Sequence, residues 1–508
     1  MHIKLSSSYT ILAISLFSNP VLAESPAVTG ARALIESAPE SVTSYLETLP
    51  ETYSFQSRFN GESSVSYTGQ IFRQVLISDL SSFISSLEKG SYPGLSENAY
   101  AALDSYYSYT YDAELSSAGA INGFTEFEIG GFNKLGERMP IAEGTMYDDI
   151  QEEGKQLRDK TAGNDNPLTR GELKGWTSDV YGISLSAVDA DKNDDGIVEP
   201  EDFIQALLTV IASEAADGET LTLGNERINA AAVMPNGVHL GELLEKFMMG
   251  AVSFSQAAED YLNVDAKPEK GLSVDNKEPS KAGVNYTTLE HHWDEGFGYF
   301  GAARDYVNYP VEVIAAKQSL DTNNDAKISL LSEKNYSAAV YAAKRKLGAL
   351  VDGNVKDEYD FSSKSFSYFL KGRHLIAAGN EAFVPYAKAY ATLVIDQWEK
   401  VLAASTIHYI NSYLSELKSF GSDTYRFSEL AKVWSEAKGF ALSFQFNPKS
   451  SMSNSDFDRL HQLLGDSPAA VPGQSAQADV KAYEQSLLMA RSLLAKSFGF
   501  DAGDVSAW

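Results

Sequence analysis

The sequence predicts an all-α protein built as a large helical-bundle domain, and it leaves open whether that domain divides into two pseudo-symmetric bundles. Most of the chain is rich in Ala, Leu, Glu, Lys and Gln, which favour helices. Within residues 384–418, Val394, Trp398, Val401 and His408 recur at helical spacing on one face. Alternating patterns typical of strands are few and short. These three observations favour a helix bundle.

Five long segments carry the helical composition, namely residues 203–215, 238–262, 335–351, 384–418 and 480–498. Two polar stretches containing Gly and Pro, 161–176 and 264–283, predict hinges between helical units or long loops. The Ser- and Tyr-rich region 92–118 shows no clear periodicity, which predicts a loop over the surface.

The chain is strongly acidic. Its 508 residues include 41 Lys and Arg against 69 Asp and Glu, which gives a formal net charge of −28. Such a surface repels phosphate backbones and anionic lipids, and this argues against nucleic-acid binding. It attracts cations and suits calcium-rich surroundings, although acidic excess also serves solubility.

The N-terminal residues predict export. Lys4 precedes a short apolar run, and residues 19–23 end in a small-residue cleavage pattern, so we expect a signal peptide over 1–23. No later segment approaches the 18 apolar residues of a membrane span. The chain has no cysteine, so neither disulfides nor a lipoprotein anchor are expected. We therefore predict a periplasmic or secreted protein with one domain over 24–508.

The strongest motif is a calcium loop over residues 191–202 (DKNDDGIVEPED), which matches the EF-hand pattern closely. In such loops, side chains at alternate positions converge on one ion and a glycine takes the sharp turn. The predicted calcium ligands are Asp191, Asn193, Asp195, the Ile197 carbonyl, Glu199 and Asp202, with Gly196 at the turn. The alternative is an acidic surface turn without an ion.

A weaker loop follows over residues 321–333 (DTNNDAKISLLSE). Ala326 replaces the glycine, and Glu333 comes one place later than the usual final acid. The predicted calcium ligands are Asp321, Asn323, Asp325, Lys327, Ser329 and Glu333. Both loops predict calcium with a structural role.

Histidine–carboxylate pairs form a second group of candidates. His239 and Glu242 are three residues apart, as are His291 and Asp294, and His292 and Glu295. This spacing places both side chains of a pair on one face of a helix. Two helices that each bring one pair could build a four-ligand site for iron, zinc, copper or manganese. The alternative is hydrogen-bonded core or surface pairs without a metal.

Other motifs carry little chemistry. Residues 296–301 (GFGYFG) match G-x-G-x-x-G, but no strand precedes them, and close helix packing around small residues is the better interpretation. His374 and His408 are expected to be structural, and His461 is expected to face solvent. The familiar nucleophile, zinc-protease and phosphate-loop motifs are absent from the sequence, so no local motif indicates an enzyme.

Several stretches resemble an exported bacterial family that carries only a domain-of-unknown-function label. The most specific is 289–301 (LEHHWDEGFGYFG), and the others are 63–70 (SSVSYTGQ), 244–251 (LEKFMMGA), 398–400, 439–441 and 446–448. The resemblance implies one large domain and no known activity. The G-x-H-x-x-E of Gly237, His239 and Glu242 also resembles the imelysin-like proteins, which implies paired helical bundles and a metal role for His239 and Glu242.

These observations predict an exported, calcium-binding helical protein of the cell envelope. We expect it to bind a ligand such as a transition metal, iron or zinc among them, or a metal complex, in an iron-uptake type of role that could involve an envelope partner protein. One alternative is a metal-dependent hydrolase with Glu242 or Glu295 as general base. Another is a calcium-stiffened surface or adhesion protein whose Tyr-rich region 97–111 meets glycans.

Overall fold

The computed structural model describes residues 24–109, 156–165, 171–185, 197–265, 270–325, 328–350 and 354–508. The predicted signal peptide, 1–23, lies outside these residues. Helices dominate the described chain, which confirms the all-α prediction. The α-helices are α1 (Pro26–Glu36), α2 (Glu40–Leu46), α3 (Thr68–Ser86), α4 (Ser96–Tyr107), α7 (Pro200–Asp217), α8 (Leu240–Met248), α9 (Thr288–Phe300), α10 (Val311–Ala315), α11 (Ser337–Gly348), α12 (Phe361–Ala377), α13 (Val384–Glu416), α14 (Phe427–Leu442), α15 (Asn454–Leu464), α16 (Gln477–Phe498) and α17 (Ala502–Val505).

Shorter elements connect these helices. Among the described residues the only sheet is a hairpin of β1 (Leu221–Leu223) and β2 (Glu226–Ile228), in which Thr222 pairs with Arg227. The 3₁₀ turns are η2 (Arg158–Lys160), η5 (Tyr306–Asn308), η6 (Asp357–Tyr359), η7 (Glu381–Phe383), η8 (Leu417–Ser419) and η9 (Ser443–Phe446), and two π-helical segments are η3 (Met249–Phe254) and η4 (Gln256–Tyr261).

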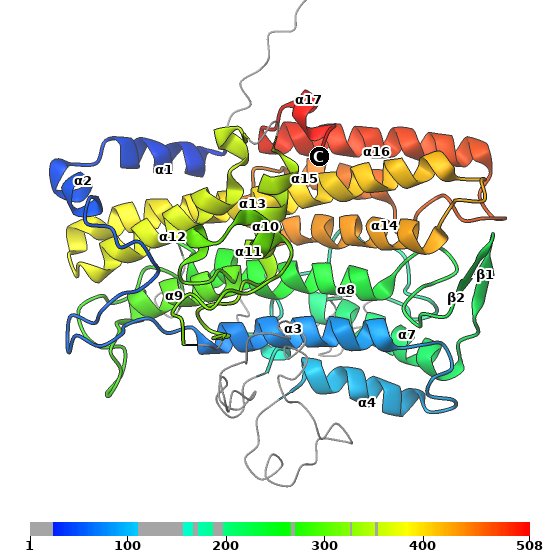
Figure 1. Ribbon diagram of the computed structural model, residues 1–508, viewed down its shortest axis with the longest axis horizontal. Coiled ribbons are helices and arrows are strands. Elements are labelled where there is room, and N and C mark those ends of the chain that lie inside the picture. The colour runs from blue at the N-terminus through cyan, green and yellow to red at the C-terminus, as the bar shows by residue number, and fades with distance from the viewer. Residues whose placement is uncertain are drawn as a thin grey trace, which may run out of the picture.

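The longest helices lie along the long axis of the molecule, with the β1–β2 hairpin at one end (Figure 1). Helix α13 lies at the centre of its half and packs against α1, α11, α12, α14 and α16. Helices α3, α4, α7 and α8 pack on one another in the other half (Figure 1). One cluster of buried apolar side chains extends from Val28 in α1 to Val505 in α17. None of the described helices is long and apolar enough to cross a membrane.

The predicted helix over 384–418 is α13, and its bounds agree within two residues. Val394, Trp398 and Val401 are fully buried, as their stripe predicts. Because neighbouring helices cover α13 on several sides, Leu393, Ala403 and many other residues off that stripe are buried too. A helix that is buried nearly all round is expected at the centre of a large helical protein.

The prediction of a surface loop over 92–118 is wrong in its described part. Residues 96–107 form α4, which packs against α7 and α3. Ala99, Ala102, Leu103 and Tyr106 are buried and recur at the i, i+3, i+4, i+7 spacing of an amphipathic helix. Tyr107 is buried as well, and its hydroxyl hydrogen-bonds Thr161 Oγ1 at 2.8 Å. Residues 110–118 lie outside the described chain.

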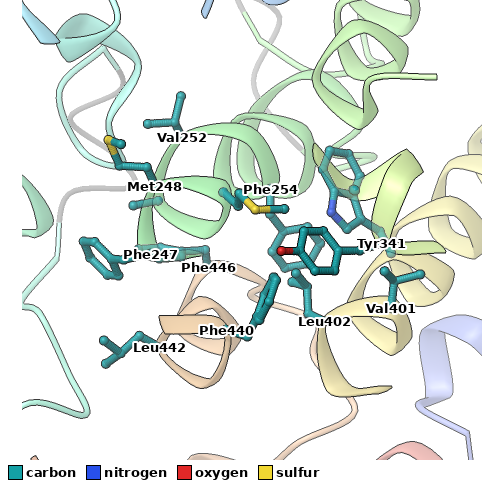
Figure 2. Packing of buried hydrophobic residues seen from close by; sticks show 14 of the residues in the cluster. Phe247, Met248, Val252, Phe254, Tyr341, Val401, Leu402, Phe440, Leu442 and Phe446 are labelled. Atoms are coloured by element: carbon teal, nitrogen blue, oxygen red, sulfur yellow. The ribbon is translucent and has the colours of Figure 1, made fainter. Parts of the chain in front are cut away.

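The segment predicted as one helix over 238–262 changes its winding partway. It begins as α8 and continues as the π-helical segments η3 and η4. Gly250 lies against the start of η9, where an added Cβ would be 2.1 Å from Ser443 Oγ. Phe247, Met248 and Phe254 lie beside Phe440 and Phe446 in the core around this stretch (Figure 2). Because π-helical segments are frequent at functional sites, η3 and η4 are candidates for residues with a functional role.

The G-x-G-x-x-G stretch packs helices closely, as the sequence interpretation holds. Its residues lie in α9, where a Cβ on Gly296 would be 2.7 Å from Leu262 and one on Gly298 would be 2.8 Å from Gln70. Gly301 ends the helix in the left-handed conformation at φ +84°. Glycine is favoured there because a Cβ destabilises that backbone conformation.

Candidate functional site

The structure describes only part of the first predicted calcium loop. Asp191, Asn193, Asp195 and Gly196 lie outside the described residues. Glu199 and Asp202 are buried and form a capping box at the start of α7, in which the Glu199 backbone N–H donates to Asp202 Oδ2 at 2.9 Å. The Val198 carbonyl, next to Ile197, accepts a hydrogen bond from Leu173 N–H at 2.8 Å. The described end of the loop is therefore anchored to α7 and to residues 171–185.

The second loop brings its first three predicted ligands together. The Asp325 backbone N–H donates to Asp321 Oδ1 at 3.2 Å and to Asn323 Oδ1 at 2.9 Å. Asn324 between them has a φ of +60°, which asparagine tolerates better than most residues. Both Asn323 and Asp325 are exposed. Three oxygen-bearing side chains thus gather around one tight turn that is open to solvent.

Glu333 closes this loop from the inside. Its Oε1 accepts hydrogen bonds from Thr322 N–H at 2.9 Å and from Asn323 N–H at 3.2 Å. Its Oε2 accepts one from Ser329 N–H at 2.8 Å, and the residue is only 2% exposed. In this arrangement Glu333 holds the two arms of the loop together. Ala326 and Lys327 lie outside the described residues.

The G-x-H-x-x-E residues form the start of α8. His239 is the N-cap, and its Nδ1 accepts a hydrogen bond from Glu242 N–H at 3.3 Å. Burial lowers the pKa of His239, so its ring is neutral near pH 7. The Glu242 carboxylate pairs with Lys246 at 3.1 Å, and Lys246 also contacts Glu245 at 2.5 Å and Glu436 at 3.6 Å.

The two histidines of α9 point to backbone carbonyls. His291 Nδ1 lies 3.2 Å from the Ser66 carbonyl oxygen, and its Nε2 lies 3.7 Å from Glu295 Oε1. His292 Nδ1 lies 2.7 Å from the Gly271 carbonyl oxygen, and burial lowers its pKa. The structure therefore joins His291 with Glu295, one turn apart, through an i, i+4 contact that differs from the predicted i, i+3 pairs.

Asp294 belongs to a buried charge cluster. Its Oδ1 accepts hydrogen bonds from Arg373 Nε at 2.8 Å and from the Tyr53 hydroxyl at 2.7 Å, and its Oδ2 accepts one from Ser66 N–H at 3.1 Å. Arg373 also donates to Glu290 Oε1 at 3.1 Å. Arg373 and Asp294 are both 0% exposed. Nothing in the local sequence identifies Arg373, which lies 79 residues from Asp294.

The predicted pairs do not assemble into a four-ligand site in the described chain. Among the residues that the structure describes, no three His, Asp or Glu side chains gather where they could hold a metal ion. His374 has structural contacts, because its Nε2 lies 3.2 Å from Thr48 Oγ1 and its ring stacks on Tyr45. The expectation for His461 is wrong, since it is 6% exposed and its Nε2 lies 3.3 Å from the Ala441 carbonyl oxygen.

Sequence reasoning also missed a buried acid, Glu399 of α13. It is 2% exposed, and its Oε2 accepts a hydrogen bond from Asn447 Nδ2 at 2.9 Å. Burial raises the pKa of Glu399 to about 8, and the nearby Asp396 adds to that effect. An acid within a helix carries no local signal of burial, because the residues that cover it come from distant parts of the chain.

This shift predicts a loss of stability with rising pH. An unshifted Glu titrates near pH 4.5, so from there to about pH 8 the folded protein keeps a proton on Glu399 that the unfolded chain releases. The free energy of unfolding therefore decreases as pH rises, by up to about 1.4 kcal/mol per pH unit for one proton. We expect Glu399→Gln to flatten the dependence of melting temperature on pH between pH 5 and 9, measured by circular dichroism. Glu358→Gln, at an exposed position, is the control, and equal slopes in both variants would contradict the prediction.

The fold and these sites define an all-α helical-bundle protein with one extended core and an acidic turn at residues 321–325. The chain belongs to the family described as Domain of unknown function (DUF4856), whose model matches residues 148–500. This confirms the resemblance to a family of unknown function. Both predicted calcium loops and residues 289–301 lie within the match, whereas residues 63–70 lie outside it. No curated protein and no solved structure matches the chain.

Proposed function

We propose that this protein is an exported helical protein of the cell envelope whose fold is stabilised by calcium at the loops 191–202 and 321–333. The observation that supports the proposal best is the turn at Asp321, Asn323 and Asp325, where one backbone N–H gathers two side-chain oxygens. Calcium prefers six to eight oxygen ligands from carboxylates, amides, carbonyls and water. With the loop already folded, calcium binding requires little rearrangement of the backbone.

Each loop is adjacent to a buried structural element, and this gives calcium a route to global stability. The first loop leads into α7, whose residues Phe203, Ile204 and Leu207 are fully buried. The second is closed by Glu333, and Tyr336 just beyond it is 5% exposed. An ion that binds only the folded chain stabilises it in proportion to the logarithm of the free calcium concentration. A structural calcium therefore fits better than a signalling one.

The transition-metal role is not part of this proposal. His239 caps a helix, His291 and His292 contact backbone carbonyls, and Asp294 is held by Arg373. A metal at Asp294 would have to displace Arg373, and no three His, Asp or Glu side chains of the described chain gather where they could hold a metal ion.

The test is a calcium titration of chelator-treated protein by isothermal calorimetry, with melting temperature as a second readout. We expect the wild type to bind calcium and to melt higher in about 10 mM calcium, well above the Kd of about 1 mM found in weak extracellular modules. The double variant Asp191→Asn/Asp195→Asn loses the larger part of both effects. The variant Asp321→Asn/Asp325→Asn loses the smaller part, since its loop lacks the glycine.

Asp159→Asn is the matched control, because it removes one exposed carboxylate outside both loops. It should bind calcium as the wild type does. A wild type that shows neither heat of binding nor a shift in melting temperature would overturn the proposal. So would equal losses in the control and in both loop variants.

A further inference from the structure

A cleft of about 390 Å³ lies beside the π-helical segment η4 and has a mixed lining. Phe444, Phe446, Met452 and Phe457 provide apolar walls, and Glu259 contributes a carboxyl group. Further polar groups of the lining come from Gln445, Asn447, Ser450 and Asn454. Clefts of a few hundred cubic ångströms that combine apolar walls with polar groups are typical of small-molecule sites. The volume is large enough for a compact organic molecule.

Glu259 has unusual surroundings within the described chain. Its Oε2 is shielded from solvent and has no hydrogen-bond partner among the described residues. A buried polar atom of this kind is rare in folded proteins and calls for an explanation. Glu259 belongs to the π-helical segment η4, and it lines the cleft.

The lysines near Glu259 pair with other carboxylates. Lys270 lies 3.0 Å from Asp165 Oδ2 and 3.7 Å from Asp260 Oδ2, and Lys160 also pairs with Asp165. No described Lys or Arg side chain forms an ion pair with Glu259. Burial, together with the charges of Asp260 and Asp165, raises the pKa of Glu259 to about 9, so its carboxyl group is neutral at pH 7.

We propose that this cleft binds a small organic ammonium ion, with its charged head on Glu259 and its apolar body between Phe444, Phe446 and Phe457. The head supplies the missing hydrogen-bond donor and the missing positive charge. Aromatic faces also attract cations. On binding, the Glu259 carboxyl group releases its proton to solvent and the carboxylate pairs with the ammonium group, so one proton leaves for each ligand bound.

The remaining charges of the cleft agree with this ligand class. Glu172 and Lys174 line the cleft but are exposed, so water screens them. A bare divalent metal would find too few ligands, because no three acids or histidines of the described chain gather there.

The test is isothermal calorimetry at pH 7 with phenethylamine, and with 2-phenylethanol as a neutral probe of similar shape. Titrations in phosphate and in Tris, which differ in ionisation enthalpy, give the number of protons released. We expect phenethylamine to bind with release approaching one proton, and 2-phenylethanol to bind at least about 30-fold more weakly, because it cannot pair with the carboxylate.

Glu259→Gln keeps the shape of the neutral carboxyl group and is expected to fold, which circular dichroism verifies. It should lose phenethylamine binding by about 30-fold or more, together with the proton release. Glu358→Gln, at an exposed position outside the cleft, should behave as the wild type. Equal affinity for both probes, binding without proton release, unchanged binding in Glu259→Gln, or no binding of millimolar phenethylamine or butylamine would each overturn the proposal.

Discussion

Replacing Arg373 with methionine is expected to lower the free energy of unfolding by about 3–5 kcal/mol. The guanidinium is 0% exposed and donates hydrogen bonds to Asp294, Glu290 and the Ser64 hydroxyl. Without it, Asp294 loses its cation, and Glu290 keeps only the partly exposed Arg58 at 3.7 Å. Desolvation then penalises both buried carboxylates. Urea denaturation followed by circular dichroism measures the change.

Arg32→Met is the control for the loss of one arginine. Arg32 pairs with Glu24 at the surface, where both side chains are about one-third exposed, and such pairs contribute about 0–1 kcal/mol. Adding Asp294→Asn and Glu290→Gln to Arg373→Met should recover part of the loss, because the uncompensated charges are then gone. Similar values for Arg373→Met and Arg32→Met would contradict the structural role of the cluster.

Gly372→Ala is expected to destabilise the protein by about 3 kcal/mol, although alanine favours helices. Gly372 lies in α12, where an added Cβ would be 2.1 Å from two ring carbons of Trp293. The Trp293 ring is 0% exposed and its Nε1–H donates to the Phe369 carbonyl at 3.0 Å, so it has little freedom to move. The melting temperature and the urea midpoint report the effect.

Gly348→Ala provides the matched comparison. Gly348 is the last residue of α11, and an added Cβ there would meet no atom within 4 Å. This variant should be neutral or more stable by up to about 1 kcal/mol, because alanine loses less backbone entropy than glycine. If both glycine variants changed stability equally, the close contact between α12 and α9 would not be the cause.

The sequence predicted helix positions well in segments whose composition strongly favours helices. The segments 203–215, 335–351, 384–418 and 480–498 correspond to α7, α11, α13 and α16. The helix α4 was missed because alanine and tyrosine form much of its buried stripe, among serines that suggest a loop. The π-helical winding of η3 and η4 was not predictable either. It accompanies a close contact between Gly250 and Ser443, 193 residues apart.

The candidate sites, too, include contacts that the sequence predicts and contacts that it does not. Asp321, Asn323 and Asp325 lie within five residues, so their convergence depends on local turn geometry that the motif encodes. His239 and Glu242 share the start of one helix, but Lys246 and the buried Glu436 of α14 determine the electrostatic environment of that carboxylate. Spacing alone could not show that Arg373 would form an ion pair with Asp294.

The sequence by itself determined the helical class and the acidic net charge, because both depend on composition and on patterns a few residues long. Only the tertiary structure decided which acids are buried, which of them find a cation, and which, like Glu259, have none among the described residues. Burial and Coulomb interactions depend on distances through space. Those distances depend on contacts between residues far apart in the chain, so a local sequence pattern does not predict them.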